Sequence, residues 1–234
     1  MQIFYAPDID GDNYILDENE SKHCVKVLRM KRGTQVRLID GRGNLFEAVI
    51  SEPDYKKCKI TVLEKKSDFE KRNYRLHIAI SPLKNPERFE WFVEKSVEIG
   101  VDEITPLICK NTEKQSIKQE RVNSIIISAM KQSIKAVRPV LNFPSTFDSF
   151  IRNRHDNKLM IAHCKEYPSR ISISDACGKN ENALIMIGPE GDFSEGEIET
   201  AVKGNFVPVH LGSSRLRTET AGVAACHSIY FLNQ

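Results

Sequence analysis

Two short apolar runs near the end of the chain each stop at a glycine and lead into a helix-like segment. Leu184–Ile187 is followed by Gly188-Pro189-Glu190-Gly191, and Val207–Leu211 is followed by Gly212. Runs of this length and composition are typical of buried strands. In open α/β sheets, ligands bind beyond the carboxyl ends of the strands, and small residues there let the backbone approach a flat ligand. The pair therefore predicts one ligand site at the edge of a sheet.

From residue 74 onward, strand-like runs alternate with helix-like segments. The expected strands are Leu76–Ile80, Ile104–Ile108, Leu159–Ala162, Leu184–Ile187 and Val207–Leu211. The expected helices are Glu87–Ile99, Gln119–Ala136, one capped by Ser194 with Glu197, and one from Thr218 onward. Repeated strand–helix units predict an α/β fold, a mostly parallel sheet with helices on both faces. Small residues in the last helix, Ala221–Ala225, favour close packing, either on its own sheet or at an interface.

Residues 1–70 have a different, mostly β pattern. Val36–Asp40 and Leu45–Ile50 are joined by a glycine-rich turn that predicts a hairpin, and Cys58–Leu63 alternates as a third strand. Asp17 and Glu20 form a capping-box pattern for a short helix that we expect to end at Gly33. With a charged linker around residues 67–73, the sequence predicts two domains, a small β barrel over 1–70 and an α/β domain over 74–234.

The composition excludes several classes of protein. No apolar run approaches the roughly 20 residues of a membrane span, and the first residues lack the layout of a secretory signal, so we expect a cytoplasmic protein. The six cysteines are scattered without a C-x-x-C pair, and the six histidines form no H-x-x-x-H pattern. We therefore expect free buried thiols and no metal site.

The net charge is only +2, but the basic residues are unevenly placed. One cluster within residues 21–42 includes Lys22, Lys26, Arg29, Lys31, Arg32, Arg37 and Arg42. A second within residues 110–138 includes Lys110, Lys114, Lys118, Arg121, Lys131, Lys135 and Arg138. Such clusters favour a polyanion such as nucleic acid, although solvated helix faces are the alternative.

The ordered set of motifs resembles the 16S ribosomal RNA (uracil-N3) methyltransferases of the SPOUT class. The resemblance rests on Gly188–Gly191, on Leu211-Gly212, and on Leu216-Arg217-Thr218-Glu219-Thr220-Ala221. Ser81–Lys84, Glu94–Val101, Lys131–Ser133 with Arg138-Pro139, and His23 through Gly33 also match, so most of the chain is covered. The chain departs from the family in having Asp192 where a second glycine is usual.

The resemblance implies a trefoil knot in the α/β domain, a PUA-like RNA-binding barrel before it, and a homodimer. It implies S-adenosylmethionine as the methyl donor and 16S rRNA of the small ribosomal subunit as the partner. The implied donor-binding residues are His163, Cys164, Gly188, Pro189, Glu190, Gly191, Leu211, Gly212, Leu216, Arg217, Thr218 and Thr220. The implied RNA-binding residues are His23, Lys26, Arg29, Lys31, Arg32 and Arg42.

Methylation of N3 requires that the uracil is positioned for attack on the methyl group and that its anion is stabilised. Positioning an in-line nucleophile supplies much of the rate, and a cation near the uracil oxygens favours the anion. Arg217 is the first candidate for that cation, followed by Arg138 and Arg215. Glu219 either orients this arginine or caps the last helix.

Two other functions remain open. The protein is alternatively a non-catalytic RNA-binding protein whose knot domain serves as a dimerising scaffold. A Rossmann-type nucleotide-dependent enzyme ranks last, because the chain has no G-x-G-x-x-G after its first strand and no G-x-x-x-x-G-K-[ST] loop.

Overall fold

The computed structural model describes residues 1–153, 158–165 and 170–234. These residues form two compact units, each with its own sheet. The first unit comprises Met1–Lys71 and Met130–Arg138, and the second comprises Arg72–Ala129 and Pro139–Gln234.

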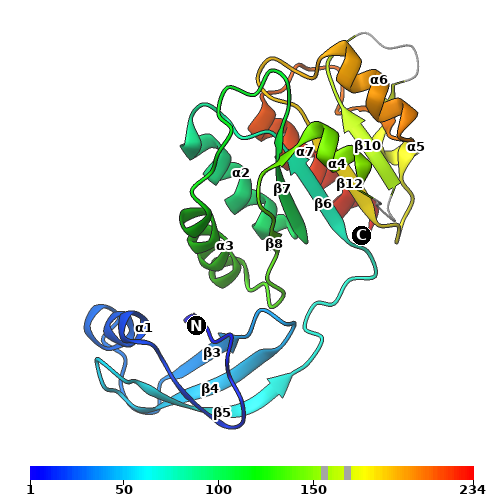
Figure 1. The fold of residues 1–234 in the computed structure, drawn as a ribbon. Helices are drawn as coiled ribbons and strands as arrows, with labels where there is room; N and C mark the ends of the chain where they lie inside the picture. The colour runs from blue at the N-terminus through cyan, green and yellow to red at the C-terminus, as the bar shows by residue number, and fades with distance from the viewer. Residues whose placement is uncertain (154–157, 166–169) are drawn as a thin grey trace. The chain divides into compact units, whose positions relative to one another are not determined.

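The first unit is built on a five-stranded sheet in the order β1-β3-β4-β5-β2. Its strands β3, β4 and β5 are labelled in Figure 1. Its strands are β1 (Ile3–Tyr5), β2 (Asn13–Ile15), β3 (Gln35–Ile39), β4 (Leu45–Glu52) and β5 (Lys59–Lys66). β1 pairs with β3 in parallel, and the remaining neighbours are antiparallel. The predicted hairpin and third strand are therefore present as β3, β4 and β5.

Asp40 stabilises the predicted hairpin turn between β3 and β4. Its carboxylate accepts hydrogen bonds from the backbone N–H groups of Arg42 (2.8 Å) and Asn44 (3.1 Å) and from the Asn44 amide (2.6 Å). Gly41 and Gly43 have positive φ angles of 75° and 100°, which glycine adopts without strain. The turn thus needs both glycines and the acid before them.

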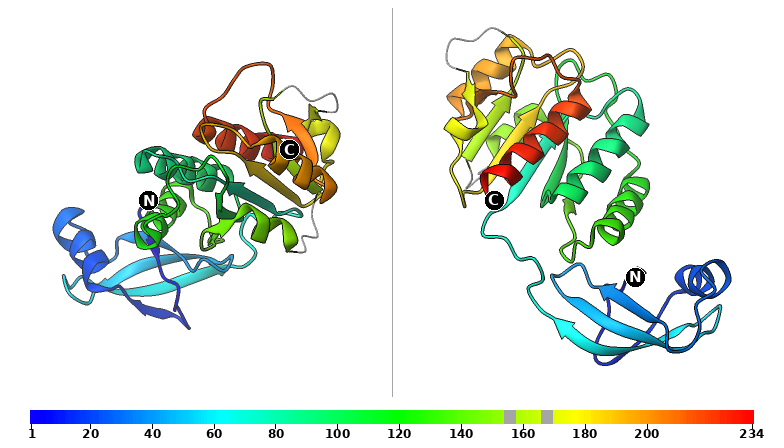
Figure 2. Two further views of the ribbon diagram at one scale, coloured as in Figure 1. Left: turned by 45° about the horizontal axis from the view of Figure 1, so that its top comes forward. Right: turned by 180° about the vertical axis from the view of Figure 1, so that it is seen from behind.

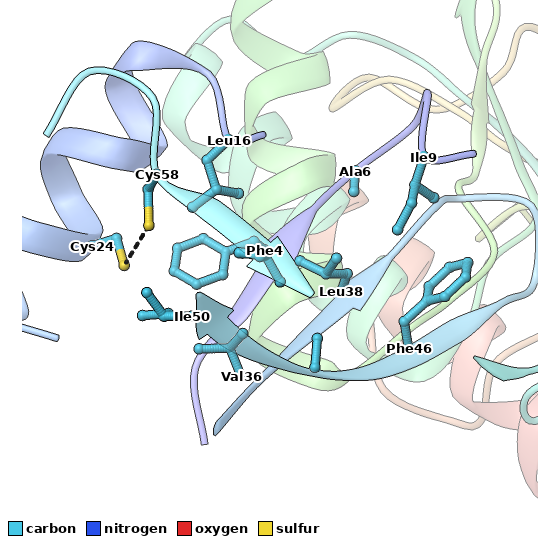
Figure 3. Close-up of a cluster of buried hydrophobic side chains, with 12 residues drawn as sticks. Phe4, Ala6, Ile9, Leu16, Cys24, Val36, Leu38, Phe46, Ile50 and Cys58 are labelled. Carbon is cyan, nitrogen blue, oxygen red and sulfur yellow. Dashed lines mark hydrogen bonds between the residues drawn. The ribbon is translucent and has the colours of Figure 1, made fainter. Parts of the chain in front are cut away.

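Apolar side chains from the strands pack against the first helix to form the core of this unit (Figure 3). Cys24 and Cys58 meet within it, with 3.9 Å between their Sγ atoms. Burial raises the pKa of the Cys24 thiol to about 12. All six cysteines are free, as predicted, and five are buried. Cys164 is exposed, so the expectation of a buried thiol is wrong at that position.

The first helix ends earlier than the sequence predicts. Asp17 caps α1 (Glu18–Lys22), accepting a hydrogen bond from the Glu20 N–H, and a π-helical turn, η1 (His23–Val27), follows. The chain then leaves the helix at Arg29, whose φ is 53°, so the expected end at Gly33 is wrong. After the wider π-helical turn, the helix thus ends at a left-handed residue that is not glycine.

The second unit contains a sheet in the order β11-β13-β10-β12-β6-β7-β8, with β9 paired to β7. All of these pairings are parallel, as predicted. The strands are β6 (Leu76–Ile80), β7 (Glu103–Ile108), β8 (Val140–Leu141), β9 (Ser145–Thr146), β10 (Lys158–Ala162), β11 (Ile171–Ser172), β12 (Ala183–Ile187) and β13 (Val207–His210).

Helices cover both faces of this sheet, as predicted (Figure 2). α2 (Pro86–Ile99) and α7 (Thr218–Leu232) pack together on one face. α4 (Phe147–Arg152) and α6 (Glu195–Lys203) pack on the other face, around Phe193 and the strand residues Leu184 and Met186. The remaining helices are α3 (Gln119–Ser133) and α5 (Ile173–Ala176). None of the helices within the described residues has the length and apolarity that a membrane crossing requires.

Two helix ends test the sequence patterns. The capping box at Ser194 and Glu197 is present with both reciprocal hydrogen bonds. The helix expected to run to Ala136 instead ends at Ser133, because Ile134 adopts a left-handed conformation with φ of 56°. Such a residue ends a helix as a C-terminal glycine normally does.

Candidate functional site

A cavity of about 930 Å³ lies where β10, β12 and β13 end. Ala162 pairs with both Ile187 and Val209, so the three strands end at one level. All three of these residues line the cavity, together with the loops that follow them. The structure therefore has a cavity at the edge of the sheet where the sequence predicts a ligand site.

Most residues of the expected donor site line this cavity. They are His163, Cys164, Gly188, Pro189, Glu190, Leu211, Gly212, Leu216, Arg217 and Thr218. Gly191 and Thr220 are not among the lining residues. The carbonyl of Gly191 instead accepts a hydrogen bond from the Asn111 amide (3.3 Å), and Thr220 is exposed on α7.

Gly188 and Gly212, in the loops after β12 and β13, are glycines for different physical reasons. A Cβ on Gly188 would lie 3.0 Å from the ring of Phe193 and 3.1 Å from its backbone nitrogen, so a side chain there would crowd Phe193. Gly212 has open space around it, but its φ of 103° is a conformation that other residues rarely adopt.

Asp192 joins the loops after β10 and β12. Its carboxylate accepts hydrogen bonds from the N–H groups of Cys164 (2.9 Å) and Phe193 (2.8 Å). Glu190 accepts one from the Lys84 N–H (3.2 Å), in the connection from β6 to α2. The acid that replaces the usual glycine therefore fixes one wall of the cavity.

Glu219 is a buried acid in the first turn of α7 that lines the cavity. Its Oε1 lies 3.8 Å from Nε of Arg88. Its Oε2 is buried and has no hydrogen-bond partner among the described residues. A buried carboxylate oxygen without a partner is costly, which makes Glu219 a candidate to accept a hydrogen bond from a ligand in the cavity that it lines.

Arg170 lies near the start of β11 and also lines the cavity. Its Nη1 donates to the backbone carbonyl of His163 (2.7 Å), and its buried Nε has no hydrogen-bond partner within the described part of the chain. Burial lowers the pKa of His163 below its usual range, and the nearby positive charge of Arg170 adds to this.

Arg88 and Arg170 were not predicted from the sequence. Each is a single arginine outside the two glycine-ended loops, so no spacing pattern marks it. Only the fold brings them to the cavity. A long-range contact of this kind has no local sequence signal.

Two of the three candidate catalytic arginines line the cavity, and the third belongs to the first unit. Arg215 and Arg217 are exposed and line the cavity, and Arg217 precedes α7 directly. Arg138 belongs to the first unit, where its N–H donates to the carbonyl of Gly41 (2.9 Å).

The expected RNA-binding residues are all exposed on the first unit. They are His23, Lys26, Arg29, Lys31, Arg32 and Arg42. The Lys26 ammonium lies 4.3 Å from the ring centre of Tyr55, an exposed aromatic residue in the β4–β5 turn. Exposed cations beside an exposed aromatic ring suit RNA, since unpaired bases stack on such rings.

The described residues contain no group of three or more His, Cys, Asp or Glu side chains arranged to hold a metal ion.

Comparison with known proteins places the chain in a family. Residues 70–230 match the RNA methyltransferase domain, and residues 16–63 match the RNA methyltransferase PUA domain. The chain is 31% identical over 232 residues to Ribosomal RNA small subunit methyltransferase E of Buchnera aphidicola subsp. Acyrthosiphon pisum (strain APS), covering 96% of this chain and 90% of that protein.

Solved structures agree with this assignment. A probable rRNA-methyltransferase from Porphyromonas gingivalis is 44% identical, with a TM-score of 0.92 over 100% of this chain and 98% of that one. A Ribosomal RNA small subunit methyltransferase E from Neisseria gonorrhoeae, solved bound to S-adenosyl methionine, is 26% identical, with a TM-score of 0.89 over 100% and 98% of the two chains. The sequence resemblance is therefore confirmed, and the chain belongs to the RNA methyltransferase family that includes Ribosomal RNA small subunit methyltransferase E.

Proposed function

We propose that this protein is an S-adenosylmethionine-dependent methyltransferase that modifies N3 of a specific uridine in 16S rRNA of the small ribosomal subunit. The observation that carries the proposal is the buried, unpartnered Oε2 of Glu219, a residue that lines the cavity at the ends of β10, β12 and β13. The names of the related proteins supply the rRNA substrate, and the family resemblance supplies the N3 position.

The cavity fits the methyl donor by size and by chemistry. Its volume of about 930 Å³ lies in the usual range for small-molecule sites, roughly 300–1,000 Å³. The donor carries an amino group and ribose hydroxyls, which donate hydrogen bonds, and a carboxylate, which accepts them. Glu219 Oε2 suits the amino group or a ribose hydroxyl, and Arg170 Nε suits the carboxylate.

The loop residues hold the adenine and ribose in this proposal. Gly188 to Glu190 and Leu211 to Gly212 present backbone groups from two strand ends that lie in register with β10. Asp192 keeps the loops together through its hydrogen bonds to Cys164 and Phe193. When bound, S-adenosylmethionine supplies an electrophilic methyl group on a sulfonium.

Arg217 stabilises the uracil anion in this proposal. The N3 of uracil carries a proton, so methylation needs loss of that proton and a cation close to the O2 or O4 oxygen. Arg217 combines exposure on the cavity wall with a fixed backbone at the start of α7. Arg215 lies two residues away on the same wall and is the second candidate.

The organisation of the protein follows the same proposal. The segment 1–70 is a PUA-like barrel that binds RNA through its exposed basic residues, and 74–234 is the catalytic domain. β13 lies beyond β10 from β12, and the chain then returns to pack α7 on β6 and β12, which supports a trefoil knot there.

A homodimer that works in the cytoplasm completes the proposal. The supporting feature is the outer side of α7, where His227 stacks on Phe231 with 6.2 Å between ring centres. Phe231 is 70% exposed, so this side of the helix presents an aromatic surface.

The direct test is methylation of small ribosomal subunits that lack this modification. We expect purified protein with S-adenosylmethionine to produce N3-methyluridine, detected by mass spectrometry of rRNA digests. Methylation at a ribose oxygen or at another base would overturn the N3 assignment. Absence of both donor binding and product would favour a non-catalytic RNA-binding scaffold.

A further inference from the structure

A second cavity, of about 420 Å³, lies between the start of α2 and the segment that leads into α3. Its walls are mostly apolar: Pro82, Leu83, Pro86, Phe89, Ile117 and Val122. Leu83, Phe89 and Val122 are almost fully buried, so these walls are packed and preformed. A cavity of this size fits a single base or nucleoside and is too small for a folded segment of another protein.

The charged residues that line this cavity are mostly basic. Lys114, Lys118 and Arg121 line it, with Glu90 as the acid among the lining residues. Arg121 already binds Glu90, with Nη2 3.1 Å from Oε2. Within the described residues, no carboxylate lies within ion-pair distance of Lys114 or Lys118. An apolar pocket that is also lined by two lysines without an ion-pair partner in the described part of the chain favours a flat apolar group that carries an anion.

The second basic cluster of the sequence, within residues 110–138, is divided between the two units. Lys131 and Lys135 lie in the first unit, where they pair with Glu20 (2.5 Å) and Glu70 (3.4 Å). Lys114 and Lys118 are the members of the cluster that face the cavity with Arg121. Lys114 and Lys118 are therefore the members of this cluster that line the cavity without an ion pair among the described residues.

One chain connection forms walls of both cavities. The N–H of Ser81 donates to the carbonyl of Ile187 (3.0 Å), and that of Lys84 donates to Glu190 (3.2 Å), so the β6–α2 connection lies against the loop of the first cavity. Pro82 and Leu83, which lie between Ser81 and Lys84 in the chain, line the second cavity. On α2, Arg88 lines the first cavity while its neighbour Phe89 lines the second.

We propose that the second cavity binds a nucleotide of the substrate RNA that neighbours the methylated uridine. The base lies between Pro86 and Ile117 over Phe89, and its phosphate lies at Lys114 and Lys118. Single-stranded RNA is bound in this way elsewhere, by apolar contact with the base and cations along the backbone. The proposal rests on the proposed function, since it takes the first cavity as the site of the target base.

The test uses two variants, one that fills the cavity and one that removes two of its lysines. Ile117→Trp places an indole in the cavity, and Lys114→Ala/Lys118→Ala removes the phosphate contacts. A matched control, Lys179→Ala/Lys203→Ala, removes two lysines of the same unit that line neither cavity. We expect each cavity variant to raise the Kd for a short single-stranded oligouridylate about tenfold or more. The control should stay within about twofold, and titration calorimetry should show unchanged S-adenosylmethionine affinity in all three.

A photo-crosslink locates the base independently of activity. An oligouridylate carrying 4-thiouridine should crosslink to the peptide containing residues 114–122 in the wild type, and Ile117→Trp should abolish this crosslink. RNA affinity and crosslinking that are unchanged in both cavity variants would overturn the proposal, as would a change of oligomeric state without a change in RNA binding. If the variants methylate small subunits like the wild type, the cavity proposal fails while the proposed function stands. If the wild type crosslinks but never methylates, the proposed function fails.

Discussion

Gly222 of α7 lies directly against Phe92 of α2. A Cβ on this glycine would stand 2.6 Å from two ring atoms of Phe92 and 2.8 Å from Ile80 of β6. The small residues of the last helix therefore serve, on this side, to pack the helix on its own sheet. The close approach brings α7, and with it Glu219 one turn earlier, against α2 and the cavity.

We predict that Gly222→Ala destabilises the protein although alanine is the better helix former. Helix propensity favours alanine by about 0.5–1 kcal/mol, but overpacking a core typically costs about 1–3 kcal/mol. Since the contact at Gly222 is far below 3.0 Å, the overpacking dominates. Denaturant unfolding should show a loss of about 1–2 kcal/mol. Gly196→Ala in α6 is the control, because nothing lies within 4 Å of its Cβ, and it should not destabilise.

The buried acid of the cavity gives a second prediction. Glu219→Gln keeps the shape of the side chain but removes its charge, and we expect S-adenosylmethionine to bind about 10- to 100-fold more weakly, since hydrogen bonds to charged groups contribute about 1.5–3 kcal/mol. Titration calorimetry measures this directly. Glu199→Gln on the exposed face of α6 serves as the control. Equal donor affinity in Glu219→Gln and the wild type would remove Glu219 from the site.

Arg217 and Arg215 are separated by their kinetic effects. If Arg217 stabilises the uracil anion, Arg217→Ala should lower kcat by about 100-fold or more, as loss of an anion-stabilising donor does in other enzymes. Arg215→Ala should lower kcat by less than about tenfold. The opposite order would transfer the role to Arg215. Single-turnover methylation of small subunits at saturating donor isolates the chemical step.

Much of the fold was predictable because its signals are local. Apolar strands ending at glycine, the capping box at Ser194 and the turn at Gly41–Asn44 each depend on residues close together in sequence. The errors fall at helix ends, where Arg29 and Ile134 take left-handed conformations. Both residues are unusual in that conformation, so the sequence gives no warning of them.

The candidate site was predictable in its loops and in the start of α7, where Thr218 and Glu219 line the cavity. Gly188 and Gly212 mark the ends of two strands, and strands that end in register bring their loops together. Arg88 and Arg170 reach the same cavity from α2 and β11, and nothing in their local sequence announces it. The reason for glycine at position 188 also differs from the expectation, because Phe193 rather than a ligand occupies the space beside it.

The outer side of α7 provides a test of the proposed dimer. Phe231 is 70% exposed and stacks on His227. A buried charge at an apolar interface is strongly unfavourable, so Phe231→Glu should convert a dimer into monomers at micromolar concentration. Light scattering after size exclusion gives the mass directly. Trp91→Glu on α2, which is 43% exposed, asks whether the interface extends to that helix. A wild type that is monomeric at these concentrations would contradict the dimer.

His163 predicts how the stability of the fold depends on pH. Burial, aided by the charge of Arg170, lowers its pKa below the ordinary 6.5, while Asp192 partly opposes the shift. The unfolded chain then binds a proton at a higher pH than the folded protein does. The stability contributed by the neutral imidazole is therefore complete above pH 6.5. It falls as the pH drops from there toward the lowered folded-state pKa, below which the loss is constant. Thermal unfolding between about pH 5.5 and 8 should show this decline in the wild type, and His163→Gln should be flatter over the same range. An equal slope in both proteins would mean that other groups titrate in this window.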